Sequence, residues 1–276
     1  MRAIGLALLI TGATLTASEA VAAAAAVPGK AILRAPTGKW VIDYAEHQCT
    51  ATRAFGTAAE PLHLLIKPSP GGEVTQIALI EKGSNFQGVQ QNASLTTSDA
   101  RTLEVMQLSY GVGDKRFRLI NLNVAQTAAV AASTSLRWNG GDPDALDVGS
   151  MTDVMKILED CRRDLRQYWS IGLEHENGRI SGPKAENSLT SFFSSDDYPS
   201  QAVSRGQQGT AGIILLIDEQ GRIRDCMVEQ TSGIATLDIM ACLVIRKRGK
   251  FSPALDRAGK PVKGAYSQRI KWVLPD

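Results

Sequence analysis

The spacing of apolar and polar residues predicts a series of short strands in the first half of the chain. Between residues 39 and 139, short runs of β-branched, aromatic and other apolar residues are separated by turns rich in Gly and Pro, such as residues 68–72. Runs of this kind, bounded by turn residues, are typical of strands. They predict strands at residues 39–44, 49–55, 62–67, 73–80, 103–110, 116–122 and 135–138. Short strands at this spacing favour an antiparallel sandwich or barrel.

One helix is predicted directly after these strands, because apolar residues then recur at steps of three and four. Ser150 is a suitable N-cap and Asp153 stands three residues later, in the position of a capping box. We expect this helix to pack on the preceding sheet. Its apolar stripe consists of Val154, Ile157, Leu158, Cys161 and Leu165.

The last 80 residues predict a helix, two strands, a second helix and a final strand. Asp196 or Asp197 is expected to cap the first short helix. The strands at 211–217 and 222–230 flank a tight turn at residues 218–221. The second helix is predicted at residues 235–248, with basic residues in its last turn and Gly249 as a left-handed C-cap. The final strand is predicted at residues 266–274.

This order of elements and its turn residues resemble the C-terminal domain family of TonB over residues 196–276. The resemblance depends on the order and spacing of many residues, each of which has a plain structural role in a turn or core. The matching residues are Tyr198, Pro199, Gly209, Thr210, Asp218, Gly221, Ser232, Gly233, Leu237, Asp238, Phe251, Pro253, Ala254, Gly259 and Pro261.

The resemblance implies a mode of partner binding. Family members grip a short extended peptide, the Ton box of an outer-membrane receptor, which adds as a strand to the edge formed by the last strand. The alternative for Arg269 and Lys271 is that their charges protect this edge against unwanted pairing. The residues predicted to form the partner-binding edge are Tyr266, Gln268, Arg269, Ile270, Lys271, Trp272 and Val273.

The N-terminus predicts export. Met1 and Arg2 precede a weakly apolar run and a string of small residues, which is the pattern of a cleaved signal peptide over residues 1–26. An uncleaved membrane anchor is the alternative, but a spanning helix needs about 20 strongly apolar residues. The chain thus departs from the family's transducers, because we expect neither an anchor nor a long Pro-rich spacer, and because it adds a β-rich domain.

Four cysteines in an exported protein suggest disulfides, and four permit three pairings. Cys49 lies in a predicted strand and Cys161 on the helix stripe, so a bridge would join helix to sheet. Two buried free thiols are the alternative for this pair. In the TonB-like fold, Cys226 of the returning strand and Cys242 of the second helix lie on elements that touch. We therefore predict the bridges Cys49–Cys161 and Cys226–Cys242.

Motifs for catalysis, metals or cofactors are lacking in the sequence, so we predict a protein that is not an enzyme and needs no cofactor or metal. The histidines His47, His63 and His175 have no ligand spacing. An enzyme site around His47, Asp43 and Arg53 is a further hypothesis, which no sequence motif supports. The formal net charge of +2 does not indicate a protein that binds nucleic acid. The basic residues 246–250 are interpreted as a solvated helix end rather than a lipid site.

Together these patterns predict an α+β protein of two domains. Residues 35–170 form an antiparallel β-rich domain that ends in an amphipathic helix, residues 171–195 a linker, and residues 196–276 the TonB-like domain. The predicted function is that of a periplasmic protein of the Gram-negative envelope, which binds an outer-membrane receptor or another envelope protein by strand addition and is linked to TonB-dependent transport. The alternative is a structural envelope protein that forms a homodimer through its edge strands.

Overall fold

The computed structural model describes residues 32–141, 144–172 and 179–274. Residues Ala31–Asp276 form one compact unit. The predicted signal peptide, residues 1–26, lies outside the described residues, as does His175. None of the helices in the described ranges has the length and apolar character needed to cross a membrane.

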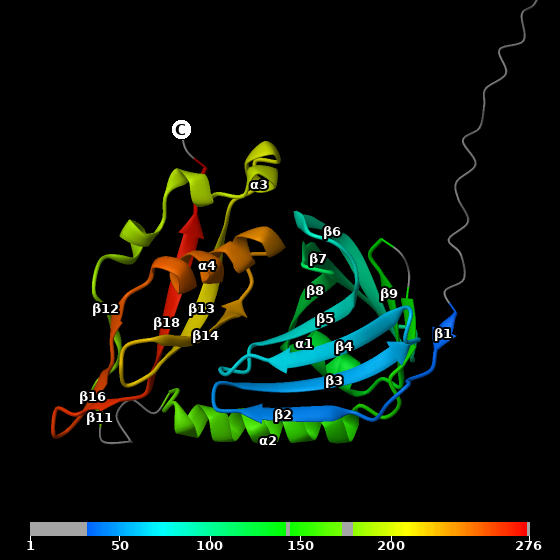
Figure 1. The fold of residues 1–276 in the computed structure, drawn as a ribbon, viewed down its shortest axis with the longest axis horizontal. Coiled ribbons are helices and arrows are strands. Elements are labelled where there is room, and N and C mark those ends of the chain that lie inside the picture. The colour runs from blue at the N-terminus through cyan, green and yellow to red at the C-terminus, as the bar shows by residue number, and fades with distance from the viewer. Residues whose placement is uncertain (1–31, 142–143, 173–178, 275–276) are drawn as a thin grey trace, which may run out of the picture. The chain divides into compact units, whose positions relative to one another are not determined.

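A ten-stranded curled sheet dominates the first part of the chain (Figure 1). Among the described residues its pairs are antiparallel, apart from the parallel pair of β1 with β10. Pro36, just after β1, bridges to Phe55 of β3 and brings opposite ends of the sheet together. The order is β1 (Leu33–Arg34), β10 (Asp144–Asp147), β9 (Ser135–Asn139), β6 (Phe86–Thr97), β7 (Thr102–Val112), β8 (Lys115–Asn123), β5 (Val74–Lys82), β4 (Pro61–Pro68), β3 (Gln48–Gly56) and β2 (Val41–Ala45).

The core of the β-rich part lies on one face of this sheet. A row of apolar partners crosses four neighbouring strands, and all its members are fully buried. Each buried Ile side chain stabilises the fold by about 1.5–3 kcal/mol, so this row is a major source of stability. The row consists of Ala51, Ile66, Ile77 and Ile120.

Two helices accompany the sheet. The predicted helix is α2 (Thr152–Tyr168), and the disulfide Cys49–Cys161 joins it to β3, as predicted. Its N-cap is Met151, so the prediction of Ser150 was wrong, and Ile157 of the expected stripe is partly exposed. The helix α1 (Val124–Ala131) was missed although Asn123 and Gln126 form a capping box at its start.

The C-terminal part has the predicted order. It contains α3 (Ser200–Ser204), β13 (Gly209–Ile217), β14 (Ile223–Gln230), α4 (Ala235–Arg248) and β18 (Gly264–Trp272). The disulfide Cys226–Cys242 joins β14 to α4, as predicted. Two cap predictions were wrong: Pro199 is the N-cap of α3, and Gly249 has a φ of −63°, outside the left-handed region.

Short strands extend this part of the fold. β15 (Phe251–Ser252), β16 (Ala254–Asp256) and β17 (Pro261–Val262) lie between α4 and β18. Within the segment that we predict to be a linker, β11 (Arg179–Ser181) pairs with β16, and β12 (Lys184–Ala185) pairs with β15. The predicted linker therefore contributes strands to the C-terminal part. The predicted domain boundaries at residues 170 and 196 remain a prediction.

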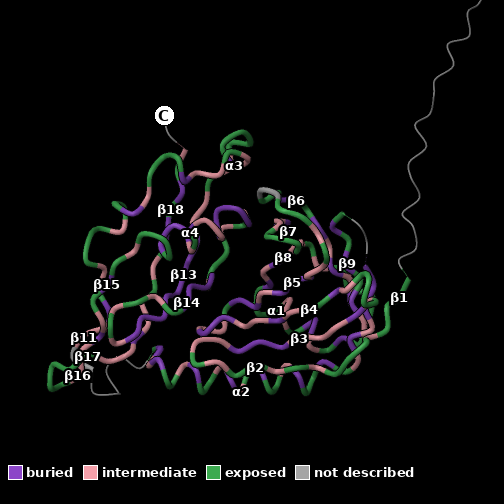
Figure 2. The backbone as a smooth tube through the Cα atoms, in the orientation of Figure 1, coloured by how far each residue is buried: buried purple, intermediate pink, exposed green. Residues whose placement is uncertain are grey.

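The three-stranded sheet β14–β13–β18 is packed on both faces. On one face Ile213 and Leu215 join a cluster with α4, which lies across the sheet (Figure 1). On the other face Ile214, Leu216 and Met227 belong to the core of the β-rich part. The central strand β13 is accordingly buried along most of its length (Figure 2). Both faces of β13 are thus covered, whereas β18 exposes Ser267, Arg269 and Lys271 on the second face.

Candidate functional site

The last strand is an edge strand, in agreement with its position at the end of the sheet order. β18 pairs with β13 over nine residues, from Gly264 opposite Ile217 to Trp272 opposite Gly209. In the part of the chain that the structure describes, β13 is its sole strand partner. Its other side therefore carries backbone N–H and C=O groups that no neighbouring strand satisfies, which is the feature that strand addition requires.

Side chains along β18 alternate between the core and the solvent. Ile270 and Trp272 are buried in the cluster under α4, whereas Arg269 and Lys271 are exposed on the opposite face. Tyr266 and Gln268 are half-buried, and Val273 is exposed. Of the seven residues predicted for the edge, Ile270 and Trp272 thus bury their side chains in the core. A partner strand can contact these two residues only through their backbone.

A groove runs along the end of β18. It has a volume of about 460 Å³ and is lined by residues 268–273 and by Leu189, Thr190, Phe193, Ser194, Ser195 and Tyr198. These latter residues come from a segment on the side of β18 opposite β13 (Figure 1). The rings of Phe193 and Tyr198 each contact the Trp272 ring edge-on, with centroids 5.4 Å apart. The groove is therefore apolar at its wall and bordered by the charges of Arg269 and Lys271.

An ion pair fixes the wall of this groove. Asp197 lies in the short 3₁₀ helix η2 (Ser195–Asp197) and accepts hydrogen bonds from Arg248 at the end of α4, with Nη2 2.9 Å from Oδ1. Arg248 also donates to the carbonyl of Phe192 over 2.8 Å. The hydrogen bond from Arg248 holds the pKa of Asp197 below its usual range. A segment predicted to be a linker is therefore anchored beside β18.

The opposite edge strand, β14, is tied to the β-rich part. The carboxylate of Glu229 accepts hydrogen bonds from Ser69 Oγ at 2.7 Å and from the Gly71 N–H at 2.5 Å, both in the turn between β4 and β5. Lys67 of β4 pairs with Asp225 at 2.8 Å. Burial raises the pKa of Glu229, although the hydrogen bonds from Ser69 and Gly71 oppose this. This edge is occupied by the protein itself.

Comparison with known families decides the identity of this part. Residues 195–274 match the family described as Gram-negative bacterial TonB protein C-terminal. These residues form a TonB C-terminal domain. No curated protein and no solved structure matches the chain.

The turn residues of the TonB C-terminal domain hold its scaffold. Gly221 has a φ of +76°, and a Cβ there would meet the carbonyl oxygen of Phe251 at 2.0 Å, so only glycine fits this turn. Asp218 accepts hydrogen bonds from the N–H groups of Gln220 and Arg222. Burial by itself would raise the pKa of Asp218, but hydrogen bonds from Arg222 outweigh it and the pKa is lowered.

A second group of these residues fixes the start of α4 and the floor of the groove. Asp238 accepts from the Ser232 N–H at 2.7 Å and from Thr231 Oγ1 at 2.5 Å. Tyr198 donates its hydroxyl to the carbonyl of Gln207 at 2.6 Å. The other residues of this set are the buried Leu237 and Phe251, the N-cap Pro199, the strand residue Gly209, the left-handed Gly233 (φ +80°) and Pro253.

The three residues of the enzyme hypothesis, His47, Asp43 and Arg53, do not line one common pocket among the described residues. Arg53 donates to the carbonyls of Gly38 and Val148, and Asp43 is exposed on β2. His47 lies in a different, charged cleft with Asp218 and Lys263. Within residues 32–141, 144–172 and 179–274, no group of His, Cys, Asp and Glu has the geometry for a metal ion.

The sequence did not reveal the wall of the groove. Leu189, Phe193 and Ser195 were placed in the linker because Gly, Ser, Asn and charge dominate residues 171–195. The adjacent pair Phe192 and Phe193 was the available signal, because two aromatic residues in a polar segment indicate packing. The basic residues 246–250 are in part structural, since Arg248 pairs with Asp197 and Arg246 lies 3.7 Å from Asp225.

Proposed function

We propose that this protein is a TonB-like protein of the Gram-negative envelope that binds an extended segment of a partner by strand addition to the outer edge of β18. The observation that supports this proposal most directly is the groove between β18 and residues 189–198. It lies beside an edge with no second strand partner among the described residues. A strand that entered it would gain main-chain hydrogen bonds from β18 and apolar contacts from the groove wall.

The family supports a binding rather than a catalytic role. Its domains bind partners and transduce energy, and their partners include outer-membrane receptors. This resemblance and the signal-like N-terminal sequence support a periplasmic location. We therefore propose a segment of an outer-membrane receptor as the partner, and a link to TonB-dependent transport across that membrane.

The packing of the TonB C-terminal domain also favours β18 as the docking edge. Both faces of β13 are covered, and β14 is tied to the turn between β4 and β5 by Glu229. An added strand would therefore pair with β18 rather than with β14.

The test is a titration of the mature chain with synthetic peptides that copy the extended periplasmic segments of outer-membrane receptors. In the Ser195→Trp variant, a large side chain fills the groove at an exposed residue whose hydroxyl has no hydrogen-bond partner among the described residues. We expect peptide affinity to fall about tenfold or more, or about 1.4 kcal/mol, with an unchanged melting temperature.

The matched control is Ser191→Trp, because Ser191 is exposed in the same segment but does not line the groove. This variant should bind as the wild type does. Equal affinities for the two variants would contradict docking in the groove. A dimer that Ser195→Trp dissociates, in a protein that takes up no peptide, would favour the self-associating envelope protein instead.

A further inference from the structure

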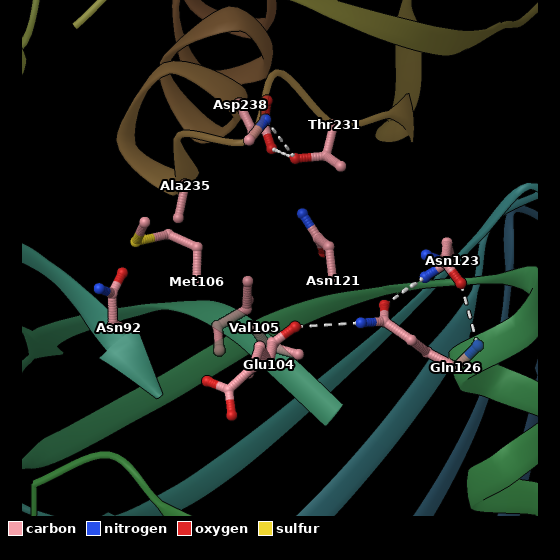
Figure 3. Close-up of a pocket in the computed structure, with 12 residues that line it drawn as sticks. Asn92, Glu104, Val105, Met106, Asn121, Asn123, Gln126, Thr231, Ala235 and Asp238 are labelled. Atoms are coloured by element: carbon pink, nitrogen blue, oxygen red, sulfur yellow. Dashed lines mark hydrogen bonds between the residues drawn. The ribbon is translucent and has the colours of Figure 1, made fainter. Parts of the chain in front are cut away.

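A second cleft lies away from β18, between the curled sheet and the turn that leads into α4. Its volume is about 440 Å³, within the range of small-molecule sites, which is roughly 300–1,000 Å³. The strands β6, β7 and β8 supply one wall, and residues 231–238 supply the other (Figure 3). The two parts of the protein thus build it jointly, as is common for ligand sites between domains.

The wall on the curled sheet presents amide groups with free hydrogen-bonding capacity. Asn121 accepts a hydrogen bond from Gln76, but its Nδ2 has no partner among the described residues. The Oδ1 of Asn123 caps α1 by accepting a hydrogen bond from Gln126, and its Nδ2 likewise has no partner among the described residues. The side chain of Asn92 makes no hydrogen bond to a described residue. Figure 3 shows Asn121 in the middle of the opening, facing Thr231 and Asp238.

The charge of the lining disfavours an anionic ligand. The lining contains neither Lys nor Arg, and its ionisable residues are Glu104 and Asp238. The carboxylate of Asp238 is already bonded to Thr231 and Ser232, so it has little capacity left for a cation. Burial, moreover, raises the pKa of Asp238. What the cleft offers is neutral hydrogen bonding beside the apolar side chain of Met106.

The pairing of β7 with β8 ends beside this cleft. The pairs begin at Gln107 opposite Ile120, so Met106 and Asn121, which both line the cleft, are not paired with each other. In this gap Gln126 donates a hydrogen bond to the main-chain carbonyl of Glu104. Amide groups of the main chain are therefore available to a ligand beside those of the side chains. Hydroxyl groups both donate and accept hydrogen bonds, so a polyhydroxylated ligand satisfies amide N–H and C=O groups together.

We infer that this cleft binds a neutral saccharide. Ring hydroxyls bond to the amides of Asn92, Asn121 and Asn123, and the apolar face of a sugar ring lies on Met106. The site is independent of the β18 groove, since the two linings share no residue. A saccharide here would bridge the curled sheet and the turn before α4.

The test is calorimetry or saturation-transfer NMR on the mature chain with three probes. Maltotriose and triacetylchitotriose are neutral, and trigalacturonate is anionic. We expect saturable binding of at least one neutral trisaccharide with a Kd of about 1 mM or tighter, and none of trigalacturonate. The variants Asn121→Leu and Asn92→Leu should each weaken binding about tenfold.

Asn92 is exposed, so its replacement leaves the fold intact even if Asn121→Leu disturbs it. The control is Asn139→Leu, an exposed Asn on β9 outside the cleft, which should bind as the wild type does. Three outcomes would overturn the inference: no neutral trisaccharide binds at about 10 mM, trigalacturonate binds as well as the neutral probes, or Asn92→Leu and Asn139→Leu bind equally.

Discussion

The two edges of the small C-terminal sheet differ in what lies beside them. Along β14, Glu229 and Asp225 are bonded to the β-rich part, and Cys226 is bonded to α4. Along β18, an apolar groove of about 460 Å³ separates the strand from residues 189–198. The β14 edge is thus bonded to other side chains of the protein, whereas the β18 edge lies beside an open groove.

This difference shows how the extra β-rich part acts on the TonB C-terminal domain. An isolated three-stranded sheet has two edges that invite pairing with other chains. Here the β-rich part occupies the neighbourhood of β14 and one face of the sheet, so a partner is directed to β18. Changes beside β14 should therefore affect stability, and changes beside β18 should affect binding.

The largest expected effect concerns the disulfide on the closed side. The double variant Cys226→Ala, Cys242→Ala removes a bridge with a sequence separation of 16, and a loop of this length corresponds to about 3 kcal/mol of stability. Chemical denaturation should show this loss, whereas peptide affinity well below the melting temperature should stay within about twofold. A parallel loss of peptide affinity would remove the distinction between the two edges.

The next effect concerns the tie between β14 and the β-rich part. In Glu229→Ala, the Ser69 hydroxyl and the Gly71 N–H lose their acceptor, which costs about 1–3 kcal/mol. The control is Glu73→Ala, which removes an exposed carboxylate of the same turn and should leave stability unchanged within about 0.5 kcal/mol. Equal unfolding free energies of the two variants would show that the Glu229 contacts do not hold this edge.

A smaller effect is expected in the pH dependence of stability. Because burial raises the pKa of Glu229 above its ordinary value of 4.5, the folded state binds this proton more tightly than the unfolded state. The associated stability is present below pH 4.5 and is lost as the pH rises through the folded-state pKa. The unfolding free energy of the wild type should therefore fall relative to Glu229→Gln over this interval. A rise of the wild type relative to this variant would contradict the effect of burial.

The last of these effects concerns the exposed charges of β18, whose removal should change self-association rather than stability. We expect the double variant Arg269→Thr, Lys271→Thr to self-associate more strongly in sedimentation experiments, because charged side chains protect an open edge. The control Lys247→Thr, Lys250→Thr removes the same charge from exposed residues at the end of α4 and should self-associate no more than the wild type. Lost peptide affinity without self-association would instead assign Arg269 and Lys271 to partner contacts.

Much of the small domain could be predicted from local patterns. The helix α4 begins and ends at the predicted residues, because Leu237, Ala241 and Ile245 form one stripe and basic residues follow in its last turn. Both disulfides could be placed because each pair lies on elements with a clear apolar face.

The elements that the sequence missed depend on contacts between distant residues. β6 is rich in Gln and Asn, so its pattern gave no strand signal, yet Gln90 is buried. Gln90 accepts hydrogen bonds from the N–H and hydroxyl of Thr236 and donates to Gln207, all of which lie more than a hundred residues away. The groove wall likewise depends on the pairing of Asp197 with Arg248. Neither partner can be found by local periodicity.

Strand addition to β18 is tested most directly with two peptides of the same sequence that carry N-methyl groups on alternate residues, offset by one. In an added strand, alternate N–H groups face the neighbouring strand and the others face away. One methylated peptide should therefore bind within about threefold of the parent peptide, and the other should bind at least about tenfold more weakly. Equal affinities of the two methylated peptides, whether both strong or both weak, would contradict strand addition at this edge.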